Sequence, residues 1–519
     1  MTTRTQTLRN TLFSSVGMYT EYVLGMLTSI VIARHLGPDG FGAYSLVIWL
    51  VAMGVATTNS GTASAAIKFV AELRGGGREA SIPALIAYLR RAQWVFLLVV
   101  LLAGAAVFVF AGEHVAPGMN HVLLLGFLVV ATTLRAAYMF NIGVAKGFEN
   151  FRATAIVALV STPVNLGLVV AAIWFDAPVE WLLAVFVVSS VVFYGMSRRQ
   201  ITPLVPAAHS PAIALPPDLL ARVRRHMWLT AMIVSVGFVA ASEVEVLFLT
   251  LYGSAHAAGQ FKVAYQIAIG SAALVPGVFG ALLLPMMANA MSQGRDVAGR
   301  RFVATTSYLA LLAAPLVAFG AVFSGAVIQA LYGSAYTAAG PVFAVCLLGV
   351  SIMTMTNGGS SLLISADRQR SVLLVVVTCG ALKVALDALL IRYYGLTGAA
   401  MAYLAVSVTC AVATMALAIR VSGAVPDWSR LLRISMAATL AALIALPLRG
   451  QLAPLAAAAL GAMVLALTYA PLTLLLGCWS RGDIEYLQRL HQHLMAGRPR
   501  ASARFLAWAY ERAPEGRAS

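Results

Sequence analysis

Long apolar stretches recur along almost the whole chain and are separated by short polar breaks. A helix crosses the hydrocarbon core of a bilayer with about 17 to 25 apolar residues, and fourteen stretches have this character. They lie near residues 12–33, 42–66, 93–111, 122–141, 153–175, 180–197, 227–250, 261–287, 302–323, 338–361, 371–391, 397–419, 433–448 and 454–478. The pattern predicts an all-α polytopic membrane protein with about fourteen transmembrane helices, and the even number places both termini on one side.

The positions of the lysines and arginines test this helix count independently, because cytoplasmic loops are enriched in these residues. Of the 35 basic residues, 29 fall in alternate breaks and in the two terminal segments. The remaining six are Arg34, Lys262, Arg392 and Arg449 on the opposite side, and Arg135 and Lys383 inside predicted helices. A single wrong span would have scrambled this segregation. The charges therefore predict that both termini are cytoplasmic.

Composition agrees with a membrane protein and narrows the possible partners. The chain has 519 residues, of which 61% are hydrophobic and 10% charged, and its mean hydropathy is +0.87. These values exclude a water-soluble globular protein. The net charge of +16 is spread over short loops and a tail, whereas nucleic-acid binding needs one basic footprint. No nucleic acid is therefore expected as a partner.

Motifs for catalysis, nucleotide binding and metal binding are missing from the sequence. It contains no GxxxxGK[ST] loop, no GxGxxG after a predicted strand, no HExxH and no cysteine or histidine ligand spacing. The predicted outer loops are also too short to form a catalytic domain. The sequence therefore predicts a non-enzymatic protein with no cofactor and no metal.

The two halves of the chain echo each other. Gly37, Gly42 and Tyr44 follow the first predicted helix as Gly253, Gly259 and Phe261 follow the seventh. A second echo relates residues 147–165, which enter the fifth helix, to residues 365–383, which enter the eleventh. The offsets are 216 residues (Gly37 to Gly253) and 218 residues (Glu149 to Asp367). One six-helix unit therefore occurs twice, as in many transporters, and glycine suits its tight helix reversals.

These segments resemble the Wzx-type polysaccharide flippases of the multidrug/oligosaccharidyl-lipid/polysaccharide exporter superfamily. The matching segments are IVIARHLGPDGFGAYSL (30–46), YG…GQFKVAYQ (252–266), ALYGSAYTAAGP (330–341), SADRQR (365–370) and YYGLTGAAMAY (393–403). They occur in this order over about 400 residues. The resemblance implies two six-helix lobes around a central cavity that opens alternately to either side, plus two further C-terminal helices.

The expected organisation follows from the repeat and the resemblance. It comprises an N-terminal lobe (1–200), a cytoplasmic linker (201–226), a C-terminal lobe (227–420), helices thirteen and fourteen (421–480) and a basic cytoplasmic tail (481–519). In the tail, Ile484, Leu487, Leu490 and Leu494 have near-helical spacing and precede the aromatic segment 505–510. The tail is interpreted either as an interfacial helix or as a partly disordered segment.

Four basic residues in or beside the predicted helices are candidates to bind a substrate phosphate: Arg34, Arg135, Lys262 and Lys383. A charge at membrane depth needs a partner, a wet cavity or a route to the interface. Arg34 and Lys262 flank the glycine turns, where they either snorkel or meet a pyrophosphate outside. Arg135 has no acid close in sequence and needs a ligand or another helix's carboxylate. Lys383 lies four residues before Asp387, at which spacing the two can neutralise each other.

Four acidic residues are candidates to couple transport to H⁺ or Na⁺: Glu21, Glu243, Glu245 and Asp387. Glu21 lies near the middle of the first helix and either lines a cavity or makes a contact between helices. Glu243 and Glu245 are two residues apart and so point about 200° apart on a helix, which lets at most one face a lumen. Ion coupling and burial beside basic neighbours both remain open for this pair.

The resemblance also implies the activity. The expected substrate is a polyprenyl-pyrophosphate-linked oligosaccharide of the O-antigen, lipopolysaccharide or exopolysaccharide type, which a flippase would move across the bacterial plasma (inner) membrane by alternating access. Membrane lipids and polysaccharide polymerase or assembly proteins are the expected partners. One alternative is an ion-coupled multidrug antiporter of the same superfamily. A membrane glycan polymerase or ligase is a third hypothesis, which the short outer loops disfavour.

Overall fold

The protein is helical throughout the part of the chain that the structure describes. The computed structural model describes residues 4–115, 120–205, 215–241, 243–252, 254–273, 280–481, 483–485, 488, 507–508 and 510–511. These residues form sixteen α-helices and four short 3₁₀ or π elements, with no strand among them. The predicted all-α fold class is confirmed.

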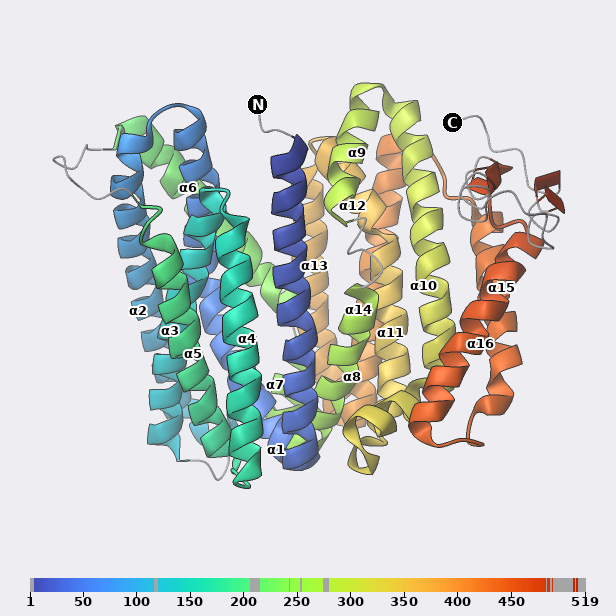
Figure 1. The fold of residues 1–519 in the computed structure, drawn as a ribbon, viewed down its shortest axis with the longest axis horizontal. Coiled ribbons are helices and arrows are strands. Elements are labelled where there is room, and N and C mark those ends of the chain that lie inside the picture. The colour runs from blue at the N-terminus through green and yellow to red at the C-terminus, as the bar shows by residue number, and fades with distance from the viewer. Residues whose placement is uncertain are drawn as a thin grey trace. The chain divides into compact units, whose positions relative to one another are not determined.

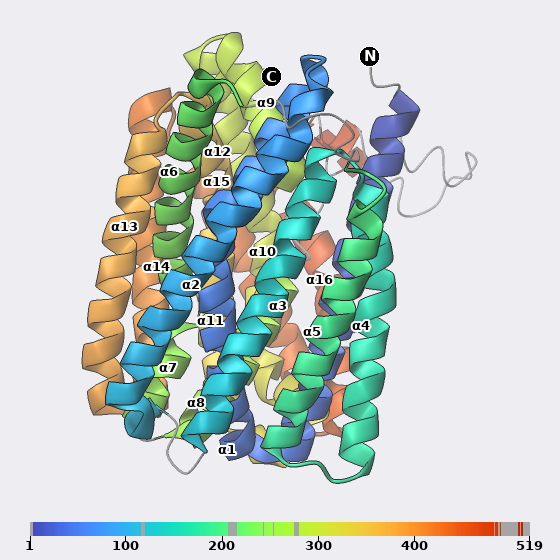
Figure 2. The same ribbon diagram turned by 90° about the vertical axis from the view of Figure 1, so that its left-hand side faces the viewer.

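The helices group into two compact units, residues 1–262 and 263–519. The helices of the first unit are α1 (Arg4–Gly75), α2 (Ile82–Val115), α3 (His121–Gly147), α4 (Phe151–Trp174), α5 (Val179–Ile201), α6 (Pro217–Ala241), α7 (Val244–Leu251) and the start of α8 (Ala255–Ala273). Helices α2 to α5 run side by side (Figure 2). The sequence places a lobe boundary at 201–226, whereas α6 and α7 pack against α1 and therefore group with the first unit.

The second unit holds the end of α8 and all later elements. They are α9 (Gly280–Ser292), α10 (Arg295–Tyr332), α11 (Ala339–Met355), α12 (Asn357–Ser365), α13 (Gln369–Leu386), the π-helix η3 (Asp387–Ile391), α14 (Arg392–Ser422), α15 (Trp428–Ala445) and α16 (Pro454–Leu475). In this unit α10 packs against α11, α15 and α16, and α14 packs against α11 and α13 (Figure 1).

Among the described residues, ten helical stretches are long and apolar enough to cross a membrane, and two of them each contain two of the predicted spans. Residues 16–75 and 369–422 form stretches of 60 and 54 residues, far longer than one crossing requires. Each is kinked at a glycine with positive φ, Gly37 (φ 68°) in α1 and Gly395 (φ 55°) in α14. Only glycine adopts this backbone geometry without strain, which explains why both reversals contain it.

Within the described residues, two predicted spans are interrupted where the sequence indicates continuous helices. The seventh breaks between α6 and α7, where the Glu243 side chain turns toward Lys262. The tenth breaks at Thr356, two residues before the dipeptide Gly358–Gly359, which weakens a helix. Of the eighth, residues 274–279 lie outside the described residues, and helices α8 and α9 are described on either side of them. Apolar length predicts a crossing, but it does not predict whether the helix is continuous.

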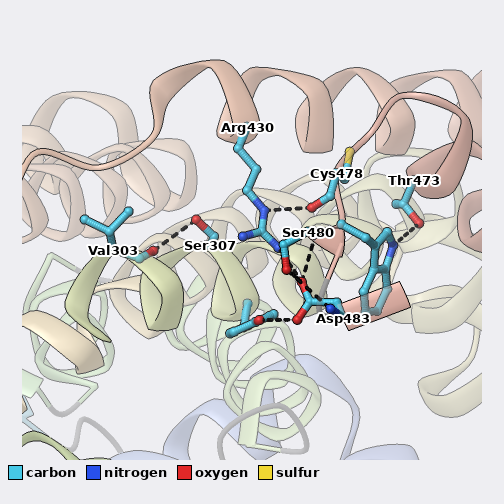
Figure 3. Close-up of polar contacts among 9 residues, drawn as sticks. Val303, Ser307, Arg430, Thr473, Cys478, Ser480 and Asp483 are labelled. Carbon is cyan, nitrogen blue, oxygen red and sulfur yellow. Dashed lines mark hydrogen bonds and ion pairs between the residues drawn. The ribbon is translucent and has the colours of Figure 1, made fainter. Parts of the chain in front are cut away.

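A carboxylate in the tail beyond α16 contacts several groups of the second unit. The Asp483 carboxylate accepts hydrogen bonds from the Ser480 hydroxyl (2.6 Å), the Ser480 amide (2.9 Å) and the Tyr308 hydroxyl, and it faces Arg430 at 3.4 Å (Figure 3). Arg430 also donates from Nε to the Cys478 carbonyl at 2.7 Å. Three of the four leucine and isoleucine positions of the predicted tail helix, 487, 490 and 494, lie outside the described residues.

Helix α16 approaches α10 closely because residue 461 has no side chain. A Cβ at Gly461 would lie 2.3 Å from Cζ of Phe323. We expect Gly461→Ala to destabilise the second unit by about 1–3 kcal/mol through overpacking, measured as a lower unfolding temperature in detergent. Gly325→Ala on α10 is the matched control, since a Cβ there meets nothing within 4 Å. Equal unfolding temperatures of the two variants would contradict the expectation.

Candidate functional site

At the end of the first unit opposite the N-terminus, here called the distal end, two glycines cross in backbone contact. A Cβ at Gly42 would lie 1.9 Å from the Ala255 carbonyl oxygen, and a Cβ at Gly259 would lie 2.0 Å from the Pro38 carbonyl oxygen. The two glycines hold matching places in the two sequence echoes. The contact is therefore reciprocal, because each copy of the repeat places a carbonyl oxygen against the glycine of the other copy. Any larger residue at either glycine would force the two segments apart.

An ion pair lies beside this glycine crossing. The Asp39 carboxylate and His256 Nδ1 are 3.1 Å apart, and both side chains are largely exposed. Sequence reasoning missed this pair, although the two residues also occupy matching places in the echoes. The distal end thus combines a close backbone contact with an accessible, titratable pair.

At the end of the first unit opposite the glycine crossing, α1 and α6 are also in close contact. A Cβ at Gly61 of α1 would lie 2.2 Å from the Met227 carbonyl oxygen of α6. Nearby, Arg222 donates two hydrogen bonds to the Glu72 carboxylate, at 2.8 and 3.0 Å. The carboxylate raises the pKa of Arg222 above its usual value through these hydrogen bonds and its charge, so Arg222 stays charged. Helix α1 therefore contacts α6 closely at one end and the start of α8 at the other.

Two of the predicted site residues neutralise each other in the first unit. Lys262 on α8 forms an ion pair and hydrogen bond with Glu243, which caps α7, and both side chains are mostly buried. Glu245, in the first turn of α7, is fully buried. The prediction that at most one of Glu243 and Glu245 faces a lumen stays a prediction. Lys262 neither snorkels nor reaches out as the sequence alternatives propose, because the helix break brings Glu243 to it.

Arg135 lies between α3 and α5. Its Nε donates to the Ser190 hydroxyl at 2.9 Å, and its guanidinium lies 4.6 and 4.4 Å from the ring centres of Phe186 and Phe193. The Glu21 carboxylate of α1 lies within electrostatic range of this guanidinium. The Arg135 guanidinium, which has no acidic residue close to it in sequence, is therefore stabilised by two aromatic faces, a hydroxyl and a more distant carboxylate.

In the second unit, Lys383 and Asp387 form the pair that their spacing predicts. Nζ of Lys383 is 3.8 Å from the Asp387 carboxylate, and the two side chains are 2% and 0% exposed. The ammonium also lies 5.6 Å from the centre of the Tyr403 ring. Neither group is accessible to a ligand in this arrangement. Arg34, in contrast, is exposed on α1 shortly before Gly37, and Glu21 is exposed further toward the N-terminus.

A polar network in the first unit was also missed by sequence reasoning. Gln93 of α2 donates to Oδ1 of Asn59 (2.8 Å) and to the Ala136 carbonyl (2.8 Å), and Asn59 donates to the same carbonyl (3.0 Å). Arg90 donates to the Asn141 amide at 2.9 Å. Buried amides that are hydrogen-bonded in this way fix the register of packed helices. No group of three or more histidine, cysteine or acidic side chains is arranged to hold a metal within the described part of the chain.

Comparisons with known proteins identify the family. A family model described as polysaccharide biosynthesis protein matches residues 7–291, more than half of the chain. The chain belongs to this family. No curated protein matches the sequence significantly.

This polysaccharide biosynthesis family member shares its fold with solved transporters. A structure titled lipid II flippase MurJ, inward closed conformation, superposes with a TM-score of 0.71 at 10% identity, covering 89% of this chain and 98% of that one. An inward-facing multidrug resistance MATE family transporter of the MOP superfamily gives 0.63 at 12% identity, with 79% and 98% covered. A MATE structure in the bent conformation gives 0.53 at 12%, with 83% and 96% covered.

Family and fold together place the chain in the multidrug/oligosaccharidyl-lipid/polysaccharide exporter superfamily, as the sequence resemblance implies. The protein is thus a multi-pass membrane protein with the fold of transporters and flippases rather than of an enzyme. The roles predicted for the eight site residues, Arg34, Arg135, Lys262, Lys383, Glu21, Glu243, Glu245 and Asp387, stay predictions.

Proposed function

We propose that this protein is a flippase for a polyprenyl-pyrophosphate-linked oligosaccharide of the O-antigen or exopolysaccharide type. The observation that carries the proposal is the match of residues 7–291 to the polysaccharide biosynthesis family. It works without a cofactor in the bacterial inner membrane with both termini cytoplasmic, the orientation that the basic loops favour. Its partners are membrane lipids and the polymerase or assembly proteins that use the exported glycan.

The physical task is to carry a large polar headgroup through hydrocarbon. Sugar hydroxyls and a pyrophosphate lose their hydration in lipid at a prohibitive cost, while the polyprenyl tail can stay in the bilayer. A protein that opens alternately to each side removes this barrier. Two contacts of α1 would open in turn. One is the glycine crossing with the start of α8 at the distal end, and the other is the Glu72–Arg222 ion pair with α6 at the opposite end.

Ion coupling through Glu21 is part of the proposal. Glu243 and Asp387 each face a lysine, and Glu245 is buried. Glu21 is exposed on α1 and lies within electrostatic range of Arg135. A proton or Na⁺ bound at Glu21 would change the charge balance at Arg135 and so favour one conformation over the other, which coupling requires.

Reconstituted liposomes test the proposal directly. A fluorescent polyprenyl-pyrophosphate oligosaccharide should become accessible to an impermeant glycosidase faster in vesicles that contain the protein than in vesicles without it. Collapsing both the proton and sodium gradients, or Glu21→Gln, should slow the reaction. Glu180→Gln is the matched control, since that acid lies on α5 outside the predicted site.

The multidrug antiporter is the second candidate, because MATE transporters share the fold. Gradient-driven efflux of a cationic dye from the same liposomes, with no oligosaccharide translocation, would establish that function in place of the flippase. Oligosaccharide translocation that does not depend on an ion gradient would support the flippase function and contradict ion coupling.

A further inference from the structure

A cavity of about 300 Å³ opens at one end of the second unit, where α10 and α13 begin and α14 ends. Three arginines, Arg295, Arg368 and Arg420, line it together with Ser371, Leu363, Leu417 and Val421. We call this feature the arginine pocket. Its volume falls at the lower end of the range of small-ligand sites, about 300–1,000 Å³. All of its lining residues belong to one compact unit, so the pocket is complete within it.

The arginine pocket carries positive charge that no acidic side chain of its lining compensates. All three arginines are exposed, and no acidic side chain is among the lining residues. Within the described residues, no carboxylate forms an ion pair with any of the three, although Asp296 and Asp367 are their neighbours in sequence. Other arginines of the chain do have carboxylate partners, as Arg222 has Glu72 and Arg430 has Asp483. Guanidinium groups that share a concave site repel each other unless an anion lies among them.

Two of the three helix ends add to this positive field, whereas the C-terminal end of α14 beside Arg420 opposes it. Arg295 is the first residue of α10, and Arg368 is the N-cap of α13, where the helix dipole makes a cation unfavourable and an anion favourable. Ser371 lies in the first turn of α13 and presents a hydroxyl donor to the cavity. Two helix starts, a hydroxyl and three guanidiniums therefore converge on one space.

Phosphate is the anion that best fits this set of donors. A guanidinium donates two parallel hydrogen bonds to phosphate oxygens. The apolar wall of Leu363, Leu417 and Val421 suits the carbon part of a phosphate ester. We propose that the arginine pocket binds a phosphate group, carried either by a phospholipid headgroup or by a soluble phosphate compound. This proposal does not depend on the identity of the transported substrate.

Binding to the purified full-length chain tests the pocket with two probes. Radiolabelled inorganic pyrophosphate, in equilibrium dialysis at low salt, represents the soluble source. Phosphatidylglycerol, compared with phosphatidylcholine by native mass spectrometry, represents the lipid source. The triple variant Arg295→Gln, Arg368→Gln, Arg420→Gln should bind at least one probe about tenfold more weakly, since three charge-assisted contacts are lost.

A second triple variant controls for net charge. Arg300→Gln, Arg301→Gln, Arg370→Gln removes three exposed arginines close in sequence to the pocket, and it should bind both probes within about twofold of the unmodified chain. If the pocket variant loses only pyrophosphate binding, the ligand is a soluble phosphate compound. If it loses only phosphatidylglycerol binding, the ligand is a lipid headgroup. Equal losses in the two triple variants, or no binding of either probe to the unmodified chain, would overturn the site. The unfolding temperature checks the fold, and Arg368→Gln alone replaces the triple variant if that variant unfolds.

Discussion

Valine in place of Gly42 is expected to hold the distal end of the first unit open. A Cβ at this position would lie 1.9 Å from the Ala255 carbonyl oxygen, about half of an ordinary carbon contact distance. A backbone carbonyl cannot rotate away as a side chain can, so the two segments must separate. We expect Gly42→Val to lower the unfolding temperature, by overpacking of about 1–3 kcal/mol or more, and to abolish transport.

Thiol labelling measures the opening itself. In a variant that lacks the four native cysteines, His256→Cys should react faster with a water-soluble maleimide when Gly42→Val is also present. Gly25→Val is the control on the same helix, because a Cβ at Gly25 meets nothing within 4 Å. If labelling and unfolding temperature are the same in the Gly42 and Gly25 variants, the glycine crossing does not hold this end together.

Methionine in place of Lys383 should destabilise the second unit by about 3–5 kcal/mol, because it removes the ammonium that lies 3.8 Å from the fully buried Asp387 carboxylate. The double variant Lys383→Met/Asp387→Leu removes both charges and should recover most of the loss. The unfolding temperatures of the two single variants and the double variant give the interaction between the residues.

Transport by the same variants separates a structural role of the pair from a substrate role. If Lys383 only neutralises Asp387, transport should return with stability in the double variant. A stable double variant that does not translocate would assign Lys383 to the substrate path instead. Unchanged stability of Lys383→Met would show that the buried pair contributes nothing to the fold.

The helical architecture could be predicted because its signals are local. Apolar length predicts a crossing, and positive charge predicts on which side a loop lies, so neither requires knowledge of distant contacts. The Lys383–Asp387 pair was also predictable, because residues four apart meet on any helix. The break between α6 and α7 was not, since it depends on Glu243 meeting Lys262 across a turn.

The candidate site was predicted less completely, because contacts between distant residues leave no periodic signal. Asp39 and His256 are brought together only by the crossing of two hairpins. Only the repeat offered a clue, since both residues hold matching places in it. The three arginines of the pocket were interpreted solely as indicators of topology, because they lie in three separate breaks of the apolar pattern. Their convergence depends on how α10, α13 and α14 pack.

The glycine crossing has a consequence for how sequences of this kind can diverge. Its contacts join backbone carbonyls to glycines, so they demand only the absence of a side chain at residues 42 and 259. The neighbouring hairpin positions are free to change charge and size, as the difference between Asp39 and His256 illustrates. Homologous chains could therefore vary the chemistry around this end while keeping the same closure, provided that glycine is kept at these two positions.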